Sequence, residues 1–415
     1  MRVLVLSIWY PNAQNPVSGT FVQDQVKALM AQGHDVRVVH PVPAAPFPIR
    51  HLKAEYRALA ALPQHEVADG VQVYHPRYVT LPRHWLFERV GGWMAAALRP
   101  LLKTLHAEWP FELIHAHATY PCGFAANQLR DELFPRLPVV HTIHRTCIID
   151  APNYNAACFE RVRESLEGAD FNIFVSREGQ GLGLQYTQQR IAPRSEHIDN
   201  GVDPVKFSLS EADRAEVAAL KQQSAGCWNL VFVGYLKEVK GVKELLDAVR
   251  RLVLEEQRPL RLWLVGENHL GSYVGDYLVR HGLQDHVRLV GAVPHGRVKL
   301  WMSFADAFIL PSHSEGTPTV MFEALFLGVP SIFSRVGGVG DVATHDENAL
   351  LIPPRSVEAI GSAVRRLMDD AGLARRLGEA AHELIERRFT WARNAEAVSA
   401  VYRGLAGPQP SAGER

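Results

Sequence analysis

The chain has 415 residues, of which 47% are hydrophobic and 21% are charged, and its formal net charge at pH 7 is +0. This length exceeds one ordinary hydrophobic core, so two or three domains are expected. The balanced charge argues against a nucleic-acid-binding protein, and no nucleic-acid partner is expected.

The cysteines and the apolar segments predict a cytosolic protein without a membrane span. The four cysteines show neither CxxC pairing nor zinc-ligand spacing, which indicates reduced thiols. The N-terminal apolar run is short and is predicted to be a β-strand rather than a signal peptide. No stretch approaches about 18 uninterrupted apolar residues, the length that a membrane-spanning helix needs.

Short apolar segments, predicted to be strands, alternate with helical segments along the chain. They lie at 3–8, 36–40, 113–117, 139–143 and 171–175, and then at 230–233, 262–265, 287–290, 307–310 and 331–333. Their hydrophobicity is continuous rather than alternating, as in parallel sheets that helices cover on both faces. Two such series predict an α/β protein with two doubly wound, Rossmann-like domains.

The turn-rich stretch 200–204 is the predicted linker between these domains. The first domain is expected at 1–200 together with a last helix at 390–403, and the second at 201–389. A Gly, Pro and Ser-rich tail at 404–415 is expected to be flexible. In doubly wound sheets ligands bind outside the carboxyl ends of the strands, so the site is expected in a cleft that the two domains share.

The loop after the first strand carries Ser18, Gly19 and Thr20. Its backbone N–H groups could meet a phosphate or a sugar. The alternative is a plain strand–helix connector with a Ser or Thr cap. The GxGxxG fingerprint is absent here, which argues against a dinucleotide-dependent oxidoreductase.

Histidines end two neighbouring strands of the first domain. His115 and His117 share one face of the strand 113–117. A metal site is conceivable, but no third ligand is evident, and a contact of His117 with a ligand in the cleft is the preferred interpretation. After the next strand, His144 is a candidate for a sugar hydroxyl and Arg145 for a phosphate.

Basic and aromatic residues are interleaved at 47–57 and 77–103. They include Arg50, His51, Lys53 and Arg57, and then Arg83, Arg89 and Arg99 with Trp85, Leu86, Phe87, Trp93 and Leu98. This pattern is typical of a patch on an anionic membrane surface. An ordinary amphipathic helix with a solvated face is the equally weighted alternative.

In the second domain, a strand, a glycine turn and a helix start follow one another around Gly234. Lys237 and Lys240 lie where a diphosphate would meet the helix N-terminus. The alternative for each is a solvated surface lysine. Gly266 ends the next strand in the same way, but its neighbours give less indication of a ligand site.

Residues 315–330 are the most informative segment of the chain. Pro318 suits the first turn of a helix that is apolar all round and therefore predicted to be buried. Glu323 in its middle must meet a cation, a donor hydrogen or a ligand, because an unpaired buried carboxylate is costly. With Glu315 before the helix start, the segment predicts a site for a phosphate and for hydroxyl groups, as in a sugar nucleotide.

A glycine-rich turn follows the next strand. It contains Arg335, Gly337, Gly338 and Gly340. The turn is either a flexible connection or a loop that closes over the donor.

Together these segments resemble a family-4 glycosyltransferase of the GT-B fold, over nearly the whole chain to about residue 402. The motifs are Ser-Gly-Thr-Phe-Val from Ser18, Ile-His-Ala-His from Ile114, Asn-Gly-Val-Asp from Asn200, the stretch Val233 to Gly241, Pro311-Ser312, Glu315 with Glu323, and Val336-Gly-Gly. The glutamates with seven residues between them, in a Glu-Gly-x-Pro context, are the most specific element. The first loop is similar to that of members that build bacterial surface polysaccharides.

The resemblance implies a role for individual residues. The catalytic set is His117, Lys240 and Glu315, with Glu315 on donor-sugar hydroxyls and Lys240 on the diphosphate leaving group. The implied donor and nucleotide contacts are Gly19, Gly234, Lys237, Lys240, Gly266, Glu315, Gly316, Thr317, Thr319 and Glu323, the last of these holding the ribose. His144, Arg145 and Arg335 are candidates for the acceptor or for phosphate. The family fold also implies a last helix that crosses back to the first domain.

One position departs from the family pattern. Tyr235 stands where the family usually has an arginine, so one of two expected diphosphate cations is missing. Lys237, Arg145 and Arg335 are the candidate replacements.

The resemblance further implies transfer from a nucleotide-diphosphate sugar with retention of configuration, without a metal or another cofactor. The expected acceptor is a glycan or a polyprenyl-linked saccharide, and the expected location is the cytoplasm, with peripheral attachment to the inner face of the cell membrane as an option. A sugar-nucleotide epimerase, a pyridoxal-phosphate phosphorylase and a non-catalytic sugar-nucleotide-binding protein are the competing hypotheses. The first would convert donor alone, the second would show a cofactor absorbance, and the third would turn over nothing.

Overall fold

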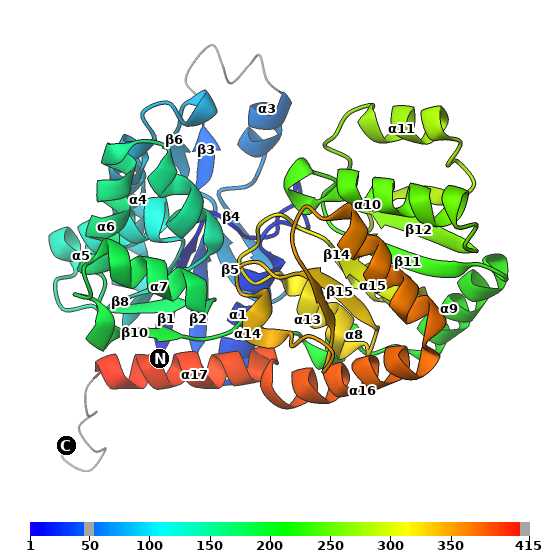
Figure 1. Cartoon of the computed structure of the whole chain (residues 1–415). Coiled ribbons are helices and arrows are strands. Elements are labelled where there is room, and N and C mark those ends of the chain that lie inside the picture. Colours follow the sequence, from blue (N-terminus) through cyan, green and yellow to red (C-terminus); the bar gives the residue numbers. More distant parts are fainter. Residues whose placement is uncertain (45–53, 407–415) are drawn as a thin grey trace. The chain divides into compact units, whose positions relative to one another are not determined.

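The computed structural model describes residues 1–44 and 54–406, and the chain divides into two compact units. The first unit is Met1–Asp199 with the segment from Trp391 onward, and the second is Asn200–Thr390. Figure 1 shows both as α/β structures, each with a wholly or mainly parallel sheet between helices. The two doubly wound domains expected from the sequence are therefore present.

The first unit contains an eight-stranded sheet in the order β10-β9-β8-β7-β1-β2-β5-β4. All its neighbouring strands are parallel except the β4–β5 pair. Two further strands, β3 and β6, pair with each other. The bounds are β1 Arg2–Ser7, β2 Asp35–Val39, β3 Val42–Ala44, β4 His65–Ala68, β5 Val71–Tyr74, β6 Arg77–Val79, β7 Leu113–His117, β8 Val139–Ile143, β9 Phe171–Phe174 and β10 Ser195–His197.

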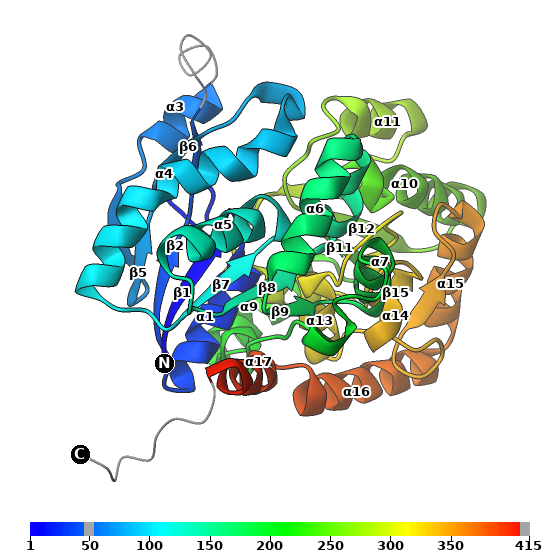
Figure 2. The same cartoon turned by 90° about the vertical axis from the view of Figure 1, so that its left-hand side faces the viewer.

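Helices cover both faces of this sheet because successive strand residues point to opposite faces and both sets are apolar. Val3 and Val5 of β1 pack with helices α1 and α17, whereas Leu4 and Leu6 pack with α4 and α5. Figure 2 views the side on which α4, α5 and α6 lie. The helix bounds are α1 Thr20–Ala31, α3 Ala54–Ala60, α4 Phe87–Glu108, α5 Phe124–Leu133, α6 Ala156–Gly168, α7 Arg177–Tyr186 and α17 Trp391–Ala406.

The last helix, α17, is an integral part of the first unit (Figure 1, red). The buried side chains of Gln25 and Asn394 are joined by a 2.8 Å hydrogen bond. His34 lies 2.9 Å from Ser399. Tyr402 is buried in the part of the core that contains the apolar residues of α1. The helix runs to Ala406, so the predicted tail from 404 is wrong for its first three residues, and 407–415 lie outside the described residues.

The second unit contains a six-stranded parallel sheet in the order β13-β12-β11-β14-β15-β16. The strand bounds are β11 Trp228–Val233, β12 Leu260–Val265, β13 Val287–Gly291, β14 Ala307–Leu310, β15 Ser331–Ser334 and β16 Leu350–Ile352. The helix bounds are α8 Pro204–Phe207, α9 Glu211–Gln223, α10 Val242–Arg250, α11 Tyr273–His281, α12 His295–Phe304, α13 Thr319–Phe326, α14 Val339–Val342, α15 Val357–Asp369 and α16 Ala371–Arg388.

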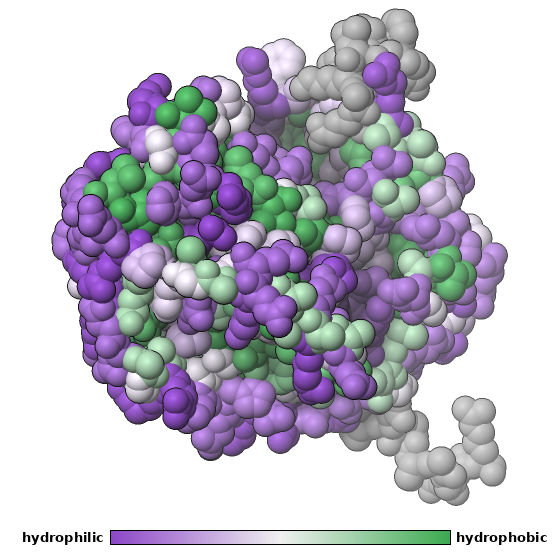
Figure 3. Space-filling view, turned by 90° about the vertical axis from the view of Figure 1, so that its right-hand side faces the viewer, coloured by the Kyte–Doolittle hydropathy of each residue, from purple (hydrophilic) through white to green (hydrophobic). Residues whose placement is uncertain are grey.

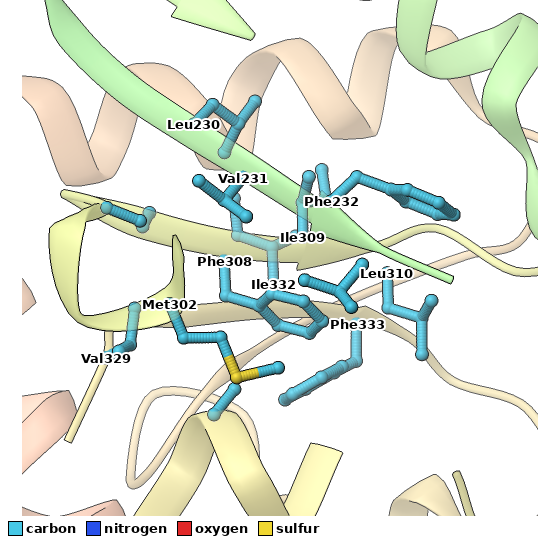
Figure 4. Close-up of a cluster of buried hydrophobic side chains, with 14 of the residues drawn as sticks. Leu230, Val231, Phe232, Met302, Phe308, Ile309, Leu310, Val329, Ile332 and Phe333 are labelled. Carbon is cyan, nitrogen blue, oxygen red and sulfur yellow. The ribbon is translucent and has the colours of Figure 1, made fainter. Parts of the chain in front are cut away.

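One continuous hydrophobic core joins this sheet to its helices. Figure 4 shows its centre, where Phe232, Phe308 and Phe333 from neighbouring strands lie among aliphatic side chains and Met302. Local signals set the helix starts, as at α9, where Ser210 and Asp213 form a reciprocal capping box. On the face seen in Figure 3, hydrophilic residues surround separate hydrophobic patches, the usual surface of a folded chain.

Candidate active site

Lys240 lies in the loop between β11 and α10, at the carboxyl edge of the second unit's sheet. The loop ends in a short 3₁₀ turn, Glu238–Lys240, followed by Gly241 with φ +69°. A Cβ atom at Gly241 would lie only 2.0 Å from the carbonyl oxygen of Pro311. Only glycine tolerates this conformation and this contact, so the Lys240 turn is held against the end of β14.

Lys240 reaches a carboxylate from that neighbouring strand end. Its Nζ donates to Oε1 of Glu315 at 2.6 Å, and the buried Ser312 Oγ donates to the same oxygen at 2.6 Å. Glu315 is only 8% exposed, which explains its need for two donors. The sequence predicted a role for each residue, and the structure brings them together.

Helix α13 begins at Thr319, so Pro318 is its N-cap residue rather than the first helical residue expected. In the described structure no side chain caps this helix, which leaves first-turn N–H groups for another acceptor. The preceding residues are clamped because the Gly338 N–H donates to the Gly316 carbonyl at 2.6 Å. Thr317 is buried beside them. An uncapped helix start beside a lysine can stabilise an anion.

The glycine-rich turn before α14 packs against the backbone of residues 315 and 316. Gly337 has φ +54°, and a Cβ atom there would lie 2.0 Å from the Glu315 carbonyl oxygen. The turn is therefore pressed against the backbone of Glu315. Arg335 at its start is exposed.

Glu323 is buried in the middle of α13, as predicted, and the structure supplies its partner. Nε2 of His295, the first residue of α12, lies 2.8 Å from Oε1 of Glu323. The sequence interpretation missed His295. Its signal was a histidine that follows a strand end closely, the feature that drew attention to His144.

Gly234 and Gly266 end adjacent strands and approach each other closely. A Cβ atom at Gly266, which has φ +140°, would lie 2.0 Å from the Gly234 carbonyl oxygen. Lys237 is exposed, and its Nζ lies 4.8 Å from the ring centroid of Tyr235. His269 meets the same ring edge-on at 5.1 Å. Lys237 is therefore the candidate cation that lies beside the Tyr235 position.

In the first unit, the predicted ligand contacts at strand ends gather around His117. His117 Nδ1 lies 3.2 Å from His144 Nε2, and the two rings are stacked at 5.5 Å. His144 in turn contacts Trp9 at 5.4 Å and Phe21 at 4.8 Å. Nε2 of His117 is buried and has no hydrogen-bond partner in the described part of the chain, so it can serve a ligand.

Gly19 shapes the loop that enters α1. It has φ +68°, and a Cβ atom there would lie 2.3 Å from the Trp9 backbone. Because Trp9 and Phe21 both contact His144, Gly19 fixes the aromatic setting of that ring. The Ser18 and Thr20 caps weighed in the sequence are not used, since no side chain caps α1 in the structure described.

Burial keeps these imidazoles neutral. Desolvation lowers the pKa of His115, His141 and His144 to about 3, and it lowers the pKa of His117 well below its ordinary value. Neutral rings can donate or accept one hydrogen bond at each nitrogen, but they provide no positive charge for a phosphate.

Two residues singled out in the sequence have structural partners. His115 lies between Tyr402, 2.5 Å away, and Thr142, 2.7 Å away, so it ties α17 to the sheet. Arg145 donates to Asp150 at 2.8 Å.

The expected aromatic and basic patch is smaller than the sequence predicted, because Leu98 is buried and Arg99 pairs with Glu132.

Part of that patch is an exposed turn at 83–86. Trp85 is 73% exposed, Leu86 is 38% exposed, and Arg83 and Arg89 are exposed on either side. Arg50, His51 and Lys53 lie outside the described residues.

Among the described residues, no three or more His, Cys, Asp or Glu side chains are grouped so that they could share a metal ion. No helix at 1–44 or 54–406 has the length and apolar character to cross a membrane.

Solved structures with the same architecture define the class of fold. Sucrose-phosphate synthase from Thermosynechococcus elongatus is 22% identical, with a TM-score of 0.76 over 98% of this chain and 99% of that one. The Anabaena protein HepE in complex with UDP-glucose is 18% identical, with a TM-score of 0.71 over 97% and 99%. The fold is therefore GT-B, with two Rossmann-like domains, as expected.

Sequence relatives define the family. Residues 18–206 match the model of Glycosyltransferase Family 4, and residues 221–384 match that of Glycosyl transferases group 1. The TuaC protein of Bacillus subtilis, whose name assigns it to teichuronic acid biosynthesis as a glycosyltransferase, is 30% identical over 97% of this chain and 98% of its own length. The chain belongs to this glycosyltransferase family and is an enzyme that transfers sugars.

Proposed function

We propose that this glycosyltransferase moves a sugar from a nucleotide-diphosphate donor to a hydroxyl of a glycan or a polyprenyl-linked saccharide during surface polysaccharide synthesis. The contact of Lys240 with buried Glu315, beside the uncapped start of α13, carries the proposal. It brings a cation from the loop before α10 to a hydroxyl acceptor that lies just ahead of an uncapped helix start. TuaC, named for teichuronic acid, supports the polysaccharide assignment.

The donor would lie along this edge of the second unit. Lys240 and the first-turn N–H groups near Thr319 would hold the diphosphate, with Gly316 and Thr317 lining its approach. The glycines 234 and 266 would let the donor approach the strand ends closely. Glu315 would accept hydrogen bonds from sugar hydroxyls, and Glu323 would accept them from the ribose.

The chemistry would proceed by front-face attack with retention of configuration. The bond from the anomeric carbon to the diphosphate oxygen breaks while the acceptor oxygen bonds to the same carbon. The acceptor proton passes to a phosphate oxygen of the leaving group. Lys240 and the helix start would offset the charge that develops on the diphosphate, without a metal. His117 would hydrogen-bond the transferred sugar.

The exposed turn 83–86 supports a location on the cytoplasmic face of the membrane. Trp85 and Leu86 would enter the lipid interface while Arg83 and Arg89 meet anionic headgroups. Flotation with phosphatidylglycerol vesicles tests this, with Trp85→Ala expected to release the protein and the exposed Val279→Ala serving as control. Equal flotation of both variants, or none of the wild type, contradicts this role of the turn.

A product assay tests the reaction itself. The purified protein is incubated in EDTA with UDP-, GDP- and dTDP-sugars, with and without short saccharides or lipid extracts as acceptors. Nucleotide release that requires an acceptor, with an α-linked product from an α-linked donor, is the expected result. Conversion of donor alone to an epimer, or an inverted product, contradicts the proposal.

A further inference from the structure

Glu323 is held by a residue outside its own helix. His295 Nε2 lies 2.8 Å from Glu323 Oε1, and Glu323 is only 6% exposed. A carboxylate accepts hydrogen bonds and does not donate them, so the proton of this bond belongs to Nε2 of His295.

The His295 ring is itself fixed. The edge of the ring packs against Phe207 with centroids 5.5 Å apart, and the side chain is only 19% exposed. Its Nδ1 is buried without a hydrogen-bond partner among the residues described. A proton on Nδ1 would bury an N–H group without an acceptor, so the contact with Glu323 is made through the N–H of Nε2.

Both carboxylates of the donor site are anchored in the same way. Glu315 receives Lys240 and Ser312 on Oε1, and Glu323 receives His295 on Oε1. Lys240 and His295 come from other parts of the second unit, the loop before α10 and the start of α12, whereas Ser312 belongs to the same loop as Glu315. One oxygen sets the orientation of the group, and the second oxygen, Oε2, is the atom that remains for a hydroxyl.

We propose that His295 is a positioning residue for nucleotide recognition: it turns Glu323 so that Oε2 accepts a hydrogen bond from a ribose hydroxyl. This inference rests on the proposed ribose role of Glu323. Without His295 the Glu323 carboxylate would lose its orientation. The protein would then no longer distinguish a ribonucleotide from a nucleotide that lacks the ribose hydroxyl.

Calorimetric titrations of variants test the inference. The first probe is UDP or GDP, whichever binds the wild type more tightly. The other probes are the 2′-deoxy and 3′-deoxy forms of the same nucleotide. The variants are His295→Ala, His295→Gln, Glu323→Ala and the control His281→Ala at the end of α11. Gln can place an amide N–H close to the position of Nε2.

His295→Ala is expected to bind the ribonucleotide about tenfold more weakly, the scale of one hydrogen bond to a charged group. It should bind one deoxy form as the wild type does. His295→Gln should recover most of the discrimination, and His281→Ala should match the wild type. A purely structural histidine would weaken ribo- and deoxynucleotides alike.

The outcomes separate this inference from the proposed function. If Glu323→Ala loses discrimination and His295→Ala keeps it, His295 has no positioning role. If Glu323→Ala itself binds all forms like the wild type, the ribose role of Glu323 fails. Melting curves identify a variant that does not fold, and His295→Gln then decides the question.

Discussion

Variants of the Lys240–Glu315 pair distinguish two possible roles of Lys240: stabilising the leaving group in catalysis, or only neutralising the buried carboxylate of Glu315. Lys240→Ala leaves Glu315 with Ser312 Oγ as its donor in the unliganded protein. A hydrogen bond to a charged group contributes about 1.5–3 kcal/mol. The Lys240 side chain is 23% exposed, so solvent screening reduces this contribution to about 1–2 kcal/mol. For a domain of this size that lowers the melting temperature by roughly 2–8 °C.

The activity of the same variants should behave differently from their stability. Lys240→Ala should reduce kcat about 100-fold, as the loss of other electrostatic stabilisers does. The double variant with Glu315→Gln should recover stability, because a neutral amide needs no cation, while its kcat stays at or below that of Lys240→Ala. Thermal melts and initial rates at saturating donor measure both quantities. A double variant that regains activity would show that Lys240 acts only by holding Glu315, and a fully active Lys240→Ala would move the leaving-group role elsewhere.

Three further predictions address the rest of the structure. Gly241→Ala should weaken nucleotide binding at least tenfold by calorimetry, because its Cβ would lie 2.0 Å from the Pro311 carbonyl and must displace the Lys240 turn; unchanged binding would show that the turn is adaptable. Tyr402→Phe removes the contact with His115 and should lower the free energy of unfolding in urea by about 1–2 kcal/mol; no change would make that contact dispensable. Since the folded-state pKa of several buried histidines is about 3 and the ordinary value is about 6.5, the unfolded chain binds more protons below pH 6.5. Their contribution to stability should be complete above about pH 6.5 and be lost as pH falls towards 3, as urea titrations at several pH values would show; stability that rises on acidification over this range contradicts the neutral assignment of His40, His115, His141 and His144.

The sequence predicted the central strands well because each is a continuous apolar run buried on both faces. It missed β4 and β5, which pair antiparallel at the edge of the first sheet, and the three-residue strands β3, β6, β10 and β16. The burial of β4 is one-sided and partial, so its residues carry little hydrophobic signal. Such edge elements are defined by their neighbours rather than by their own composition.

The candidate site, like the fold, was predicted from the sequence only in part. Lys240, Glu315 and Glu323 stood out because charged residues beside glycine turns or inside apolar helices need a specific partner. The identity of those partners depends on the fold: Lys240 reaches Glu315 from the loop before α10, and His295 reaches Glu323 from the start of α12. The sequence also overestimated the basic surface, because the partner of Arg99, Glu132, lies on a different helix.

One titration tests the central claim most directly, namely that the lysine and helix start of the second unit bind the diphosphate of the donor. The wild type and Lys240→Ala are titrated calorimetrically with UDP, GDP and dTDP in EDTA. We predict that one nucleotide binds the wild type clearly more tightly than the others, and that Lys240→Ala weakens this binding at least tenfold. Absence of binding by all three, or equal affinity of the two proteins, would contradict the account.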